Sequence, residues 1–368
     1  MSTVSDLLSQ LVRIPSVNPA GDPGTQEVGE KRCAEFLAGH LRDLGASVEL
    51  RDVFPGRPNV LARFPSDRPG KPRLLLAPHT DTVSVVGMTI DPFGGEVRDG
   101  KIWGRGSSDT KGPMAAMLAA LGNCRDRLPA LSHEIWFAGL MGEEVGQHGA
   151  KTLAGQERFD FVIVGEPTSL ETVHTHKGSA RLTLRTRGKA AHSSTPDRGI
   201  SAIIKMLDVL EVFRREAGGD FATRCDPVLG PPTFNIGTLR GGSNTNIVPD
   251  LCEAAVDIRT IPGQDVQPLL EALMVRFPDL EIEAKKSAPL RTEPDHALVR
   301  MLASCGAPPV GAPWFCDGAL FAAVGMPAVA LGPGSIAQAH TEDEWISIAD
   351  LEKGEAFFTA FLGCLEAV

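Results

Sequence analysis

The chain has 368 residues, and its 36 Lys and Arg against 46 Asp and Glu give a formal net charge of -10 at pH 7. This length suits two or three domains with a large core. The acidic balance offers no basic surface for phosphate groups, so we expect neither nucleic acid nor an anionic membrane as a partner. The sequence contains no Tyr, which leaves Asp, Glu, His, Lys or Cys for any acid–base chemistry.

The cysteines and the first residues bear on the cellular compartment. The seven cysteines are odd in number and scattered, without a Cys-x-x-Cys pair, which favours a reducing compartment. The first residues lack the basic and apolar regions of a signal peptide. No stretch approaches the ~18 apolar residues that span a bilayer. The sequence therefore predicts a cytoplasmic protein.

The first half of the chain alternates helix and strand patterns. Apolar periodicity predicts helices over 5–12, 26–44 and 113–121. Short apolar and β-branched runs predict strands over 48–53, 60–64, 73–77, 134–138 and 161–164, with a hairpin turn at Asp99-Gly100. This alternation is typical of an α/β domain with a mostly parallel sheet covered on both faces.

The pattern changes near residue 179 and changes back near residue 288. Between them, we expect strands over 181–187, 233–239, 253–258 and 280–284 and helices over 200–213 and 266–277. That order, β-α-β-β-α-β, is the ferredoxin-like pattern. Beyond it, we expect helices over 297–305, over 317–323 and from 349, with a strand over 328–331. The sequence thus predicts a catalytic domain over 1–177 and 288–368, interrupted by an α+β domain over 178–287.

Histidines and carboxylates follow the predicted buried strands. His79, Glu144 and Glu166 each come just after such a strand, and His340 follows the strand at 328–331. Asp109 lies just before a predicted helix. Because ligands bind at the carboxyl ends of parallel strands, these five side chains could meet in one crevice.

Packed carboxylates repel one another unless protons or cations balance them, and Glu143 adds a fourth. Two divalent cations would balance such a cluster. Two histidines and three carboxylates suit Zn, with Co or Mn as alternatives. Glu143 is left over beside the ligand Glu144, as a general base toward water should be.

Five motifs in chain order now resemble a known family. They are His79-Thr80-Asp81, Gly106 to Gly112, Glu143-Glu144, Gly165-Glu166-Pro167-Thr168 and the run GPGSIAQAH that ends at His340. They are similar to the metal-site motifs of the M20 peptidase and deacylase family, over nearly the whole chain. Within it, the acetylornithine deacetylase and succinyl-diaminopimelate desuccinylase subgroup is the most similar.

The resemblance implies a zinc-exopeptidase-like catalytic domain and a lid or dimerisation domain, which would allow a homodimer. It implies that His79 and Glu166 bind one metal, that Glu144 and His340 bind the other, and that Asp109 bridges them. Asp81 would orient His79. Within the lid, it implies that His192 helps to stabilise an oxyanion and that Asn244, Asn246 and Arg259 contact substrate.

The sequence departs from the family at two places. Gly142 stands where many relatives have an acidic residue, and Phe315-Cys316-Asp317-Gly318 replaces a common Thr-Asp or Thr-Glu sequence. Both differences concern substrate choice. The roles of Lys177, Cys316 and Asp317 stay open.

Each residue also has a simpler interpretation. Taken alone, His79 would be a hydrogen-bonded structural histidine, Glu143-Glu144 a solvated helix start, and Asp109 a helix cap. Glu166 would be a turn residue, and His340 an exposed loop histidine among Glu342, Asp343 and Glu344. His192 could lie on a surface loop, and Arg259 could pair with Asp257. The joint occurrence of the motifs favours the metal site.

The sequence therefore predicts a two-metal amidohydrolase that cleaves a small N-acyl amino acid of the acetylornithine type. Its alternatives are a desuccinylase, a carboxypeptidase acting on small peptides, and a metal-stabilised binding protein without catalysis.

Overall fold

The computed structural model of the chain describes residues 3–366, so the ends of the predicted catalytic domain, 1–2 and 367–368, lie outside it. The chain divides into two compact units, which we treat separately. The core unit comprises Met1–His174, Arg291–Val310 and Cys316–Val368. The inserted unit comprises Thr175–Leu290 and Gly311–Phe315.

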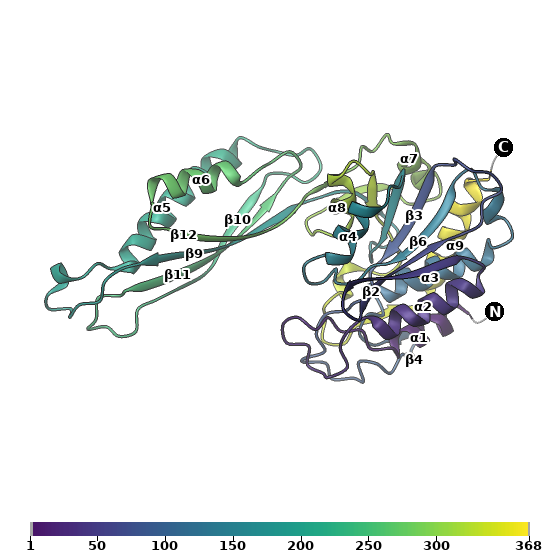
Figure 1. Ribbon diagram of the computed structural model, residues 1–368, viewed down its shortest axis with the longest axis horizontal. Helices are drawn as coiled ribbons and strands as arrows, with labels where there is room; N and C mark the ends of the chain where they lie inside the picture. The colour runs from purple at the N-terminus through teal and green to yellow at the C-terminus, as the bar shows by residue number, and fades with distance from the viewer. Residues whose placement is uncertain (1–2, 367–368) are drawn as a thin grey trace. The chain divides into compact units, whose positions relative to one another are not determined.

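A nine-stranded mixed sheet forms the centre of the core unit (Figure 1). Its strand order is β1-β2-β6-β3-β7-β15-β8-β13, with β14 paired to β8. The strands are β1 (Ser47–Phe54), β2 (Arg57–Arg63), β3 (Arg73–Pro78), β6 (Glu134–Gly139), β7 (Phe161–Gly165), β8 (Thr172–His176), β13 (Leu290–Arg291), β14 (Pro309–Ala312) and β15 (Ala328–Ala330). The four neighbours β6, β3, β7 and β15 run parallel, whereas β1, β2 and β8 pair antiparallel. The parallel strands are the continuously buried apolar runs, as expected for strands covered on both faces.

Helices cover both faces of this sheet. They are α1 (Val4–Val12), α2 (Lys31–Asp43), α3 (Lys111–Asn123), α4 (His148–Gln156), α7 (Ala297–Ser304), α8 (Gly318–Ala323) and α9 (Ile348–Cys364), with short 3₁₀ turns at Leu128–Ala130 and Ile336–Gln338. The 3₁₀ turn Pro196–Arg198 belongs to the inserted unit. The helices α1, α2, α3, α7 and α9 share one buried apolar cluster with alternate residues of β3, β6 and β7. The α/β prediction is confirmed. Within residues 3–366, no helix combines the length and the apolar character needed to cross a bilayer.

A small second sheet of the core unit has the order β16-β5-β4. Its strands are β4 (Glu96–Arg98), β5 (Lys101–Trp103) and β16 (Trp345–Ser347). The predicted hairpin joins β4 to β5, and Asp99 and Gly100 both have positive φ, at 52° and 70°, as the tight turn requires.

One helix prediction needs correction, and one helix was not predicted. The helix expected over 26–44 begins only at Lys31, because Gly29 has a φ of 90° and the side chain of Glu30 pairs with Arg57 instead of capping the helix. The helix α4 was missed, since its nine residues include two glycines and only Leu153 as a large apolar residue.

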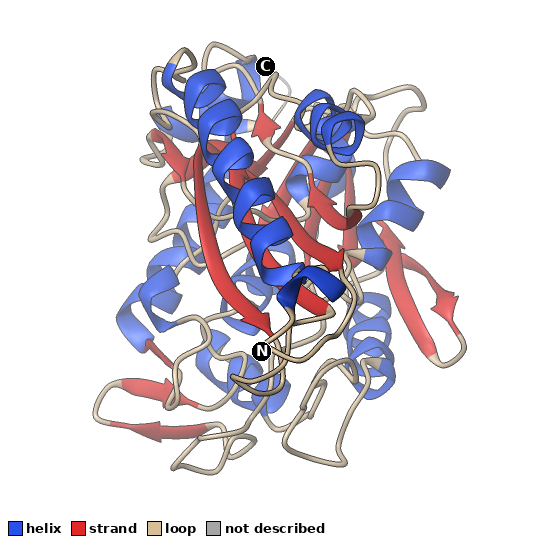
Figure 2. Cartoon of the chain, turned by 90° about the vertical axis from the view of Figure 1, so that its left-hand side faces the viewer, coloured by secondary structure: helices blue, strands red, loops and turns tan. Residues whose placement is uncertain are grey.

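The inserted unit has the predicted β-α-β-β-α-β order, and its sheet order β10-β11-β9-β12 is the ferredoxin-like one. Its elements are β9 (Gly178–Arg187), α5 (Ala202–Ala222), β10 (Thr233–Gly241), β11 (Leu251–Thr260), α6 (Gln267–Arg276) and β12 (Glu281–Ser287). Every neighbouring pair is antiparallel. Figure 2 shows the long helix α5 lying across the strands. Alternate residues of β9 and β11 are buried beneath α5 and α6, which gives this unit its own core.

Candidate metal centre

Three parallel strands of the core unit end at the same edge of the sheet. In β3 and β7, Pro78 pairs with Gly165, so the next residues, His79 and Glu166, follow neighbouring strands. His79 also forms a bridge with Leu140, which follows β6 and precedes Glu143 and Glu144. The strand ends thus bring together side chains far apart in sequence, as the strand pattern predicted.

Asp109 reaches this edge from the loop before α3. The hydroxyl of Thr110 donates a hydrogen bond to the carbonyl of Gly165, which ties the loop to the end of β7. The loop turns tightly at Gly106, whose φ is 83° and where a Cβ would lie 2.8 Å from Cγ2 of Thr82. The simpler interpretation made Asp109 the N-cap of this helix, but the residue at the N-cap position of α3 is Thr110.

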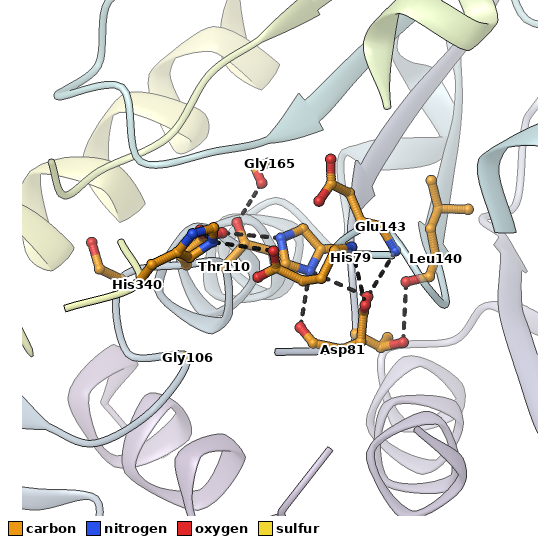
Figure 3. Close-up of polar contacts among 12 residues, drawn as sticks. His79, Asp81, Gly106, Thr110, Leu140, Glu143, Gly165 and His340 are labelled. Atoms are coloured by element: carbon orange, nitrogen blue, oxygen red, sulfur yellow. Dashed lines mark hydrogen bonds and ion pairs between the residues drawn. The ribbon is translucent and has the colours of Figure 1, made fainter. Parts of the chain in front are cut away.

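The carboxylate of Asp109 lies between the imidazole rings of His79 and His340, and Figure 3 labels these two histidines. Its Oδ1 is 3.0 Å from Nε2 of His79, and its Oδ2 is 3.3 Å from Nε2 of His340. The same Nε2 of His340 is 3.1 Å from Oε2 of Glu144. One carboxylate thus presents a separate oxygen to each of the two histidines.

His340 differs from the other members of the cluster in its exposure. Its side chain is 55% exposed, whereas that of Asp109 is 8% exposed. It follows a 3₁₀ turn and has a φ of 61°. The simpler interpretation as an exposed loop histidine is therefore correct about its exposure, but the ring contacts both Asp109 and Glu144.

The buried Asp81 organises this site chiefly through the backbone. Its Oδ1 accepts a hydrogen bond from the N–H of Glu143 (3.0 Å), and its Oδ2 accepts from the N–H of Glu144 (3.1 Å) and from Nδ2 of Asn18 (2.9 Å). The ring of His79 lies closer to the Asp81 carbonyl (Nδ1 to O, 2.9 Å) than to its carboxylate (3.5 Å). Asp81 therefore contacts His79 as expected, with its carbonyl oxygen as the nearer acceptor. In the neutral ring, Nδ1–H donates to that carbonyl and leaves the Nε2 lone pair facing Asp109.

The acidic and basic groups of this cluster shift one another's pKa values. Burial raises the pKa of Glu143 and Glu166 well above the usual range, and neighbouring carboxylates add to the rise. Burial and the charge of Asp109 raise the pKa of Glu144 to about 7. Hydrogen bonds to Asp109 and Glu144 raise the pKa of His340 to about 10. Protein groups alone therefore leave several of these carboxyl groups protonated near neutral pH.

The donor set fits a divalent cation. Oε1 of Glu144 is buried and has no hydrogen-bond partner. Ligand atoms of His79, Asp109 and Glu144 all lie within 4.8 Å of one another. Imidazole and carboxylate donors are the ligands that Zn²⁺, Co²⁺ and Mn²⁺ take in proteins, and a cation would remove the repulsion that raises these pKa values.

A further buried carboxyl belongs to the same cluster. Oδ1 of Asp317 accepts a hydrogen bond from Nε2 of Gln147 at 3.2 Å, while its Oδ2 is buried without a partner. Burial raises the pKa of Asp317 to about 7. Burial also raises the pKa of the adjacent thiol of Cys316 well above its usual range, which opposes nucleophilic chemistry there.

Sequence reasoning missed three residues that hydrogen-bond to groups of this site: Asn18 with Asp81, Gln147 with Asp317, and Glu344 with the N–H of Asp109. Asn18 and Gln147 are single amides in loops, and nothing in their surrounding sequence distinguishes them. Glu344 had a signal, since it is an acidic residue just before the strand β16 and shortly after a candidate ligand.

The inserted unit places three predicted lid residues together. His192 forms a bridge with Ile247, and Ser193 N–H donates to the carbonyl of Asn246 at 2.9 Å. His192, Asn244 and Asn246 are all exposed. Nδ1 of His192 accepts from Ser194, at 2.7 Å from Oγ and 3.2 Å from the backbone N–H. Because a backbone N–H can only donate, the neutral ring carries its proton on Nε2.

Arg259 lies at the far end of β11 from this group. Its Nη2 and Nε both donate to Oδ2 of Asp257, at 3.0 Å and 3.2 Å. The structure thus shows the ion pair between Arg259 and Asp257 that the simpler interpretation of Arg259 predicted. Nearby, Nζ of Lys177 donates to the carbonyl of Pro231 at 2.7 Å, and burial and the charge of Arg259 lower the pKa of Lys177.

Known proteins resemble this chain over nearly its whole length. An acetylornithine deacetylase of Proteus mirabilis (strain HI4320) is 34% identical over 372 aligned positions, covering 96% of this chain and 94% of that protein. The fold of a tripeptidase from Staphylococcus aureus matches with a TM-score of 0.78 at 23% identity, over 99% of this chain and 98% of that one. A dinuclear metal-binding peptidase of the M20 family from Bacillus subtilis matches with a TM-score of 0.69 at 15% identity, over 99% and 98% of the two chains. Residues 75–363 match peptidase family M20/M25/M40. With this match, and with a metal-ligand cluster at the strand ends, the chain belongs to the M20 family of metal-dependent hydrolases.

Proposed function

We propose that this protein hydrolyses the amide bond of a small N-acyl amino acid, with acetylornithine as the first candidate, to a free amino acid and a carboxylate. The observation that carries the proposal is the carboxylate of Asp109 between the imidazoles of His79 and His340. The relative at 34% identity, an acetylornithine deacetylase, supports this substrate class.

Five residues would hold two divalent ions, Zn²⁺ first and Co²⁺ or Mn²⁺ as alternatives. His79 and Glu166 would serve one ion, Glu144 and His340 the other, and Asp109 both. The relative from Bacillus subtilis, described as dinuclear, supports a pair of ions. When bound, such ions polarise a carbonyl group and lower the pKa of water.

Glu143 would act as the general base. The hydrogen bond from its N–H to Asp81 fixes its backbone, and its side chain extends away from Asp81 in Figure 3. Its carboxylate would take a proton from the attacking water as the oxygen bonds to the carbonyl carbon. As the C–N bond breaks, the same carboxyl would return that proton to the leaving nitrogen.

His192 would supply a hydrogen bond to the oxyanion. Its Nδ1 is occupied by Ser194, so the neutral ring presents Nε2–H as a donor. A donor that is already oriented costs little reorganisation when negative charge develops on the carbonyl oxygen.

The positions of His192 and Arg259 support a homodimer. Arg259 is the next-to-last residue of β11, whereas His192 lies beyond the other end of that strand. The eight residue steps from Leu251 to Arg259 span roughly 26 Å at strand rise. An acyl amino acid is too short to contact both residues of one chain. If both residues act on one substrate, they come from two copies.

One surface of the inserted unit suits a second copy. The strand β10 is at an edge of its sheet, and unpaired edges are natural sites for association. Large apolar side chains lie exposed on and around it: Ile204 (58%), Ile200 (51%), Leu207 (48%), Leu239 (47%) and Leu251 (45%). Exposed apolar residues gathered in this way mark an interaction surface.

A substrate panel with one variant tests the function. Purified protein reconstituted with Zn²⁺ should release acetate from acetylornithine, and Glu143→Gln should lower kcat by about 10³-fold or more while it keeps its bound metal. Glu157→Gln, which changes a carboxylate that pairs with Arg51, is the matched control and should stay active.

The outcomes separate the alternatives. Preference for succinyl-diaminopimelate or for small peptides would replace the deacetylase by a desuccinylase or a carboxypeptidase. Failure to hydrolyse any acyl amino acid or peptide, despite bound metal, would indicate a binding protein. Near-normal activity in Glu143→Gln would rule out Glu143 as the base.

A further inference from the structure

The carboxylate of Glu344 is buried against the loop that carries Asp109. Its exposed fraction is 0%, and that of its partner Arg105 is 3%. Oε1 accepts from the backbone N–H groups of Ser108 (2.8 Å) and Asp109 (2.9 Å). Oε2 accepts from the N–H of Gly106 (3.0 Å) and from Nη1 of Arg105 (2.9 Å). Four donors thus converge on one carboxylate.

These contacts fix the backbone of the loop next to the shared ligand. The carbonyl of Glu344 also accepts from the N–H of Gly104 at 3.0 Å, so backbone and side chain of one residue hold the loop at both ends. A buried carboxylate with four good donors is stable, but the loss of one donor would lower the free energy of unfolding, because part of the buried charge would then lack a hydrogen-bond partner.

Glu344 lies only four residues after His340, and the same segment positions that histidine. Asp343 accepts from the N–H of Thr89 (2.9 Å) and of Ile90 (3.3 Å). Trp345–Ser347 forms β16, which pairs with β5. His340 itself is exposed on a turn, so its place beside Asp109 depends on this anchored segment.

We propose that Glu344 is a positioning residue that joins the Asp109 loop and the His340 segment into one metal-binding unit. The inference rests on the proposed function, since it concerns the same centre. If the Asp109 backbone moves relative to the His340 segment, its Oδ2 no longer faces the imidazole, and the ligands of a cation separate. Loss of the supports of metal ligands typically lowers metal affinity by about 10–100-fold.

The test variant is Glu344→Gln. It keeps the size of the side chain. Because two N–H donors face each carboxylate oxygen, the NH₂ group of the glutamine would meet two donors in either orientation of the amide, and two hydrogen bonds would be lost. The matched control is Glu134→Gln. Glu134 is a buried carboxylate that forms ion pairs with Arg63 and, at 3.4 Å, with Arg73. Glu134 is the first residue of β6 and Arg73 the first residue of β3, so this pair lies at the ends of the two strands opposite to the metal centre.

The measurements are titration of the metal-free protein with Zn²⁺, the visible spectrum after titration with Co²⁺, and thermal unfolding with and without metal. Glu344→Gln should bind at least one ion about 10–100-fold more weakly. It should show an altered Co²⁺ spectrum, and excess Zn²⁺ should restore kcat with little change in KM. Glu134→Gln should lose thermal stability but bind metal like the wild type. Arg105→Lys keeps the three backbone donors to Glu344 and should show a smaller loss of metal affinity. This variant replaces Glu344→Gln in the test if Glu344→Gln does not fold.

The outcomes distinguish the two proposals. Wild-type protein that binds two ions, together with folded variants of Glu344 or Arg105 that bind them with unchanged affinity and spectrum, would overturn the positioning role alone. Wild-type protein that binds no divalent ion would overturn the proposed function and, with it, this role.

Discussion

The carboxylate of Asp81 accepts a hydrogen bond of 3.0 Å from the backbone N–H of Glu143. Its other oxygen accepts from the next N–H, that of Glu144, and its carbonyl contacts the ring of His79. One buried residue at the end of β3 therefore fixes the proposed base and two proposed ligands, because the parallel neighbour β6 ends beside it.

Replacement of Asp81 by Asn should separate this support from the metal ligands. Every group that faces the carboxylate is a donor, including Nδ2 of Asn18, so an amide would place NH₂ against a donor in either orientation. We expect kcat to fall by about 10–100-fold, as for other supports of metal ligands. Steady-state kinetics and the metal content of Asp81→Asn measure this.

Asp160→Asn is the control for that variant. Asp160 is an exposed carboxylate that accepts from the N–H of Arg73 at 2.7 Å, at the other end of β3. If Asp160→Asn loses as much activity as Asp81→Asn, the effect is one of general stability and the local role of Asp81 is wrong.

Metal affinity should rise with pH. In the metal-free protein, the pKa of Glu144 is about 7 and that of His340 is about 10. Both values are raised, so both groups hold their protons at lower pH, and a cation must displace them. Between pH 6 and pH 8 the release of the proton of His340 should therefore lower the apparent Kd by about tenfold per pH unit, and Glu144 should add to this slope only below about pH 7.

Calorimetric titration in two buffers of different ionisation enthalpy counts those protons directly. His340→Ala removes one of the groups and should reduce the count. An apparent Kd that is flat from pH 6 to pH 8 would contradict the coupling between these groups and the cation.

A buried lysine supports the start of α3. Nζ of Lys111 donates to the carbonyls of Leu11 (3.1 Å) and Ile14 (2.7 Å), and the residue is 1% exposed. Lys111→Met keeps the length of the side chain but leaves both carbonyls without this donor. We expect a loss of about 2–4 kcal/mol in the free energy of unfolding of the core unit, since an unsatisfied buried group costs roughly 1–3 kcal/mol.

Urea unfolding followed by circular dichroism measures this loss. The control Lys353→Met changes an exposed lysine, with 68% of its side chain accessible, and should shift the free energy by less than about 0.5 kcal/mol. Equal shifts in the two variants would show that the carbonyl contacts of Lys111 contribute little.

Much of the fold and the site could be predicted from local sequence patterns. The run Leu74 to Ala77 is apolar without alternation, so a strand buried on both faces, with His79 at its end, follows from composition alone. Asp99-Gly100 predicted its hairpin because both residues tolerate positive φ. The order of strand and helix patterns over 181–284 predicted the β-α-β-β-α-β order of the inserted unit.

Contacts between distant segments could not be predicted in this way. The hydrogen bond from Asp109 to Glu344 joins residues 235 apart, and that from Glu144 to Asp81 joins residues 63 apart. A carboxylate that accepts backbone N–H groups leaves no periodic signal in the sequence. The same holds for α4, where Ala150 and Ala154 pack in place of the large apolar residues that mark a helix.

The proposed dimer makes a prediction about mixed subunits. His192 lies beyond one end of β11 and Arg259 lies within the strand near its other end, and each has its own local partner, Ser194 and Asp257 respectively. If one substrate is held by His192 of one copy and Arg259 of the other, the variants His192→Ala and Arg259→Ala should each be nearly inactive alone.

Mixed dimers of these two variants should recover activity. Random assortment makes half of the dimers mixed, and each mixed dimer would have one site with both residues intact, so about a quarter of the wild-type activity should return. The variants are mixed after dissociation and reassociation, and light scattering records the dimer. Ile204→Glu, which charges an exposed side chain on α5, should give monomers and prevent the recovery. Full activity of a monomer would contradict the shared site, because one chain would then suffice for both contacts.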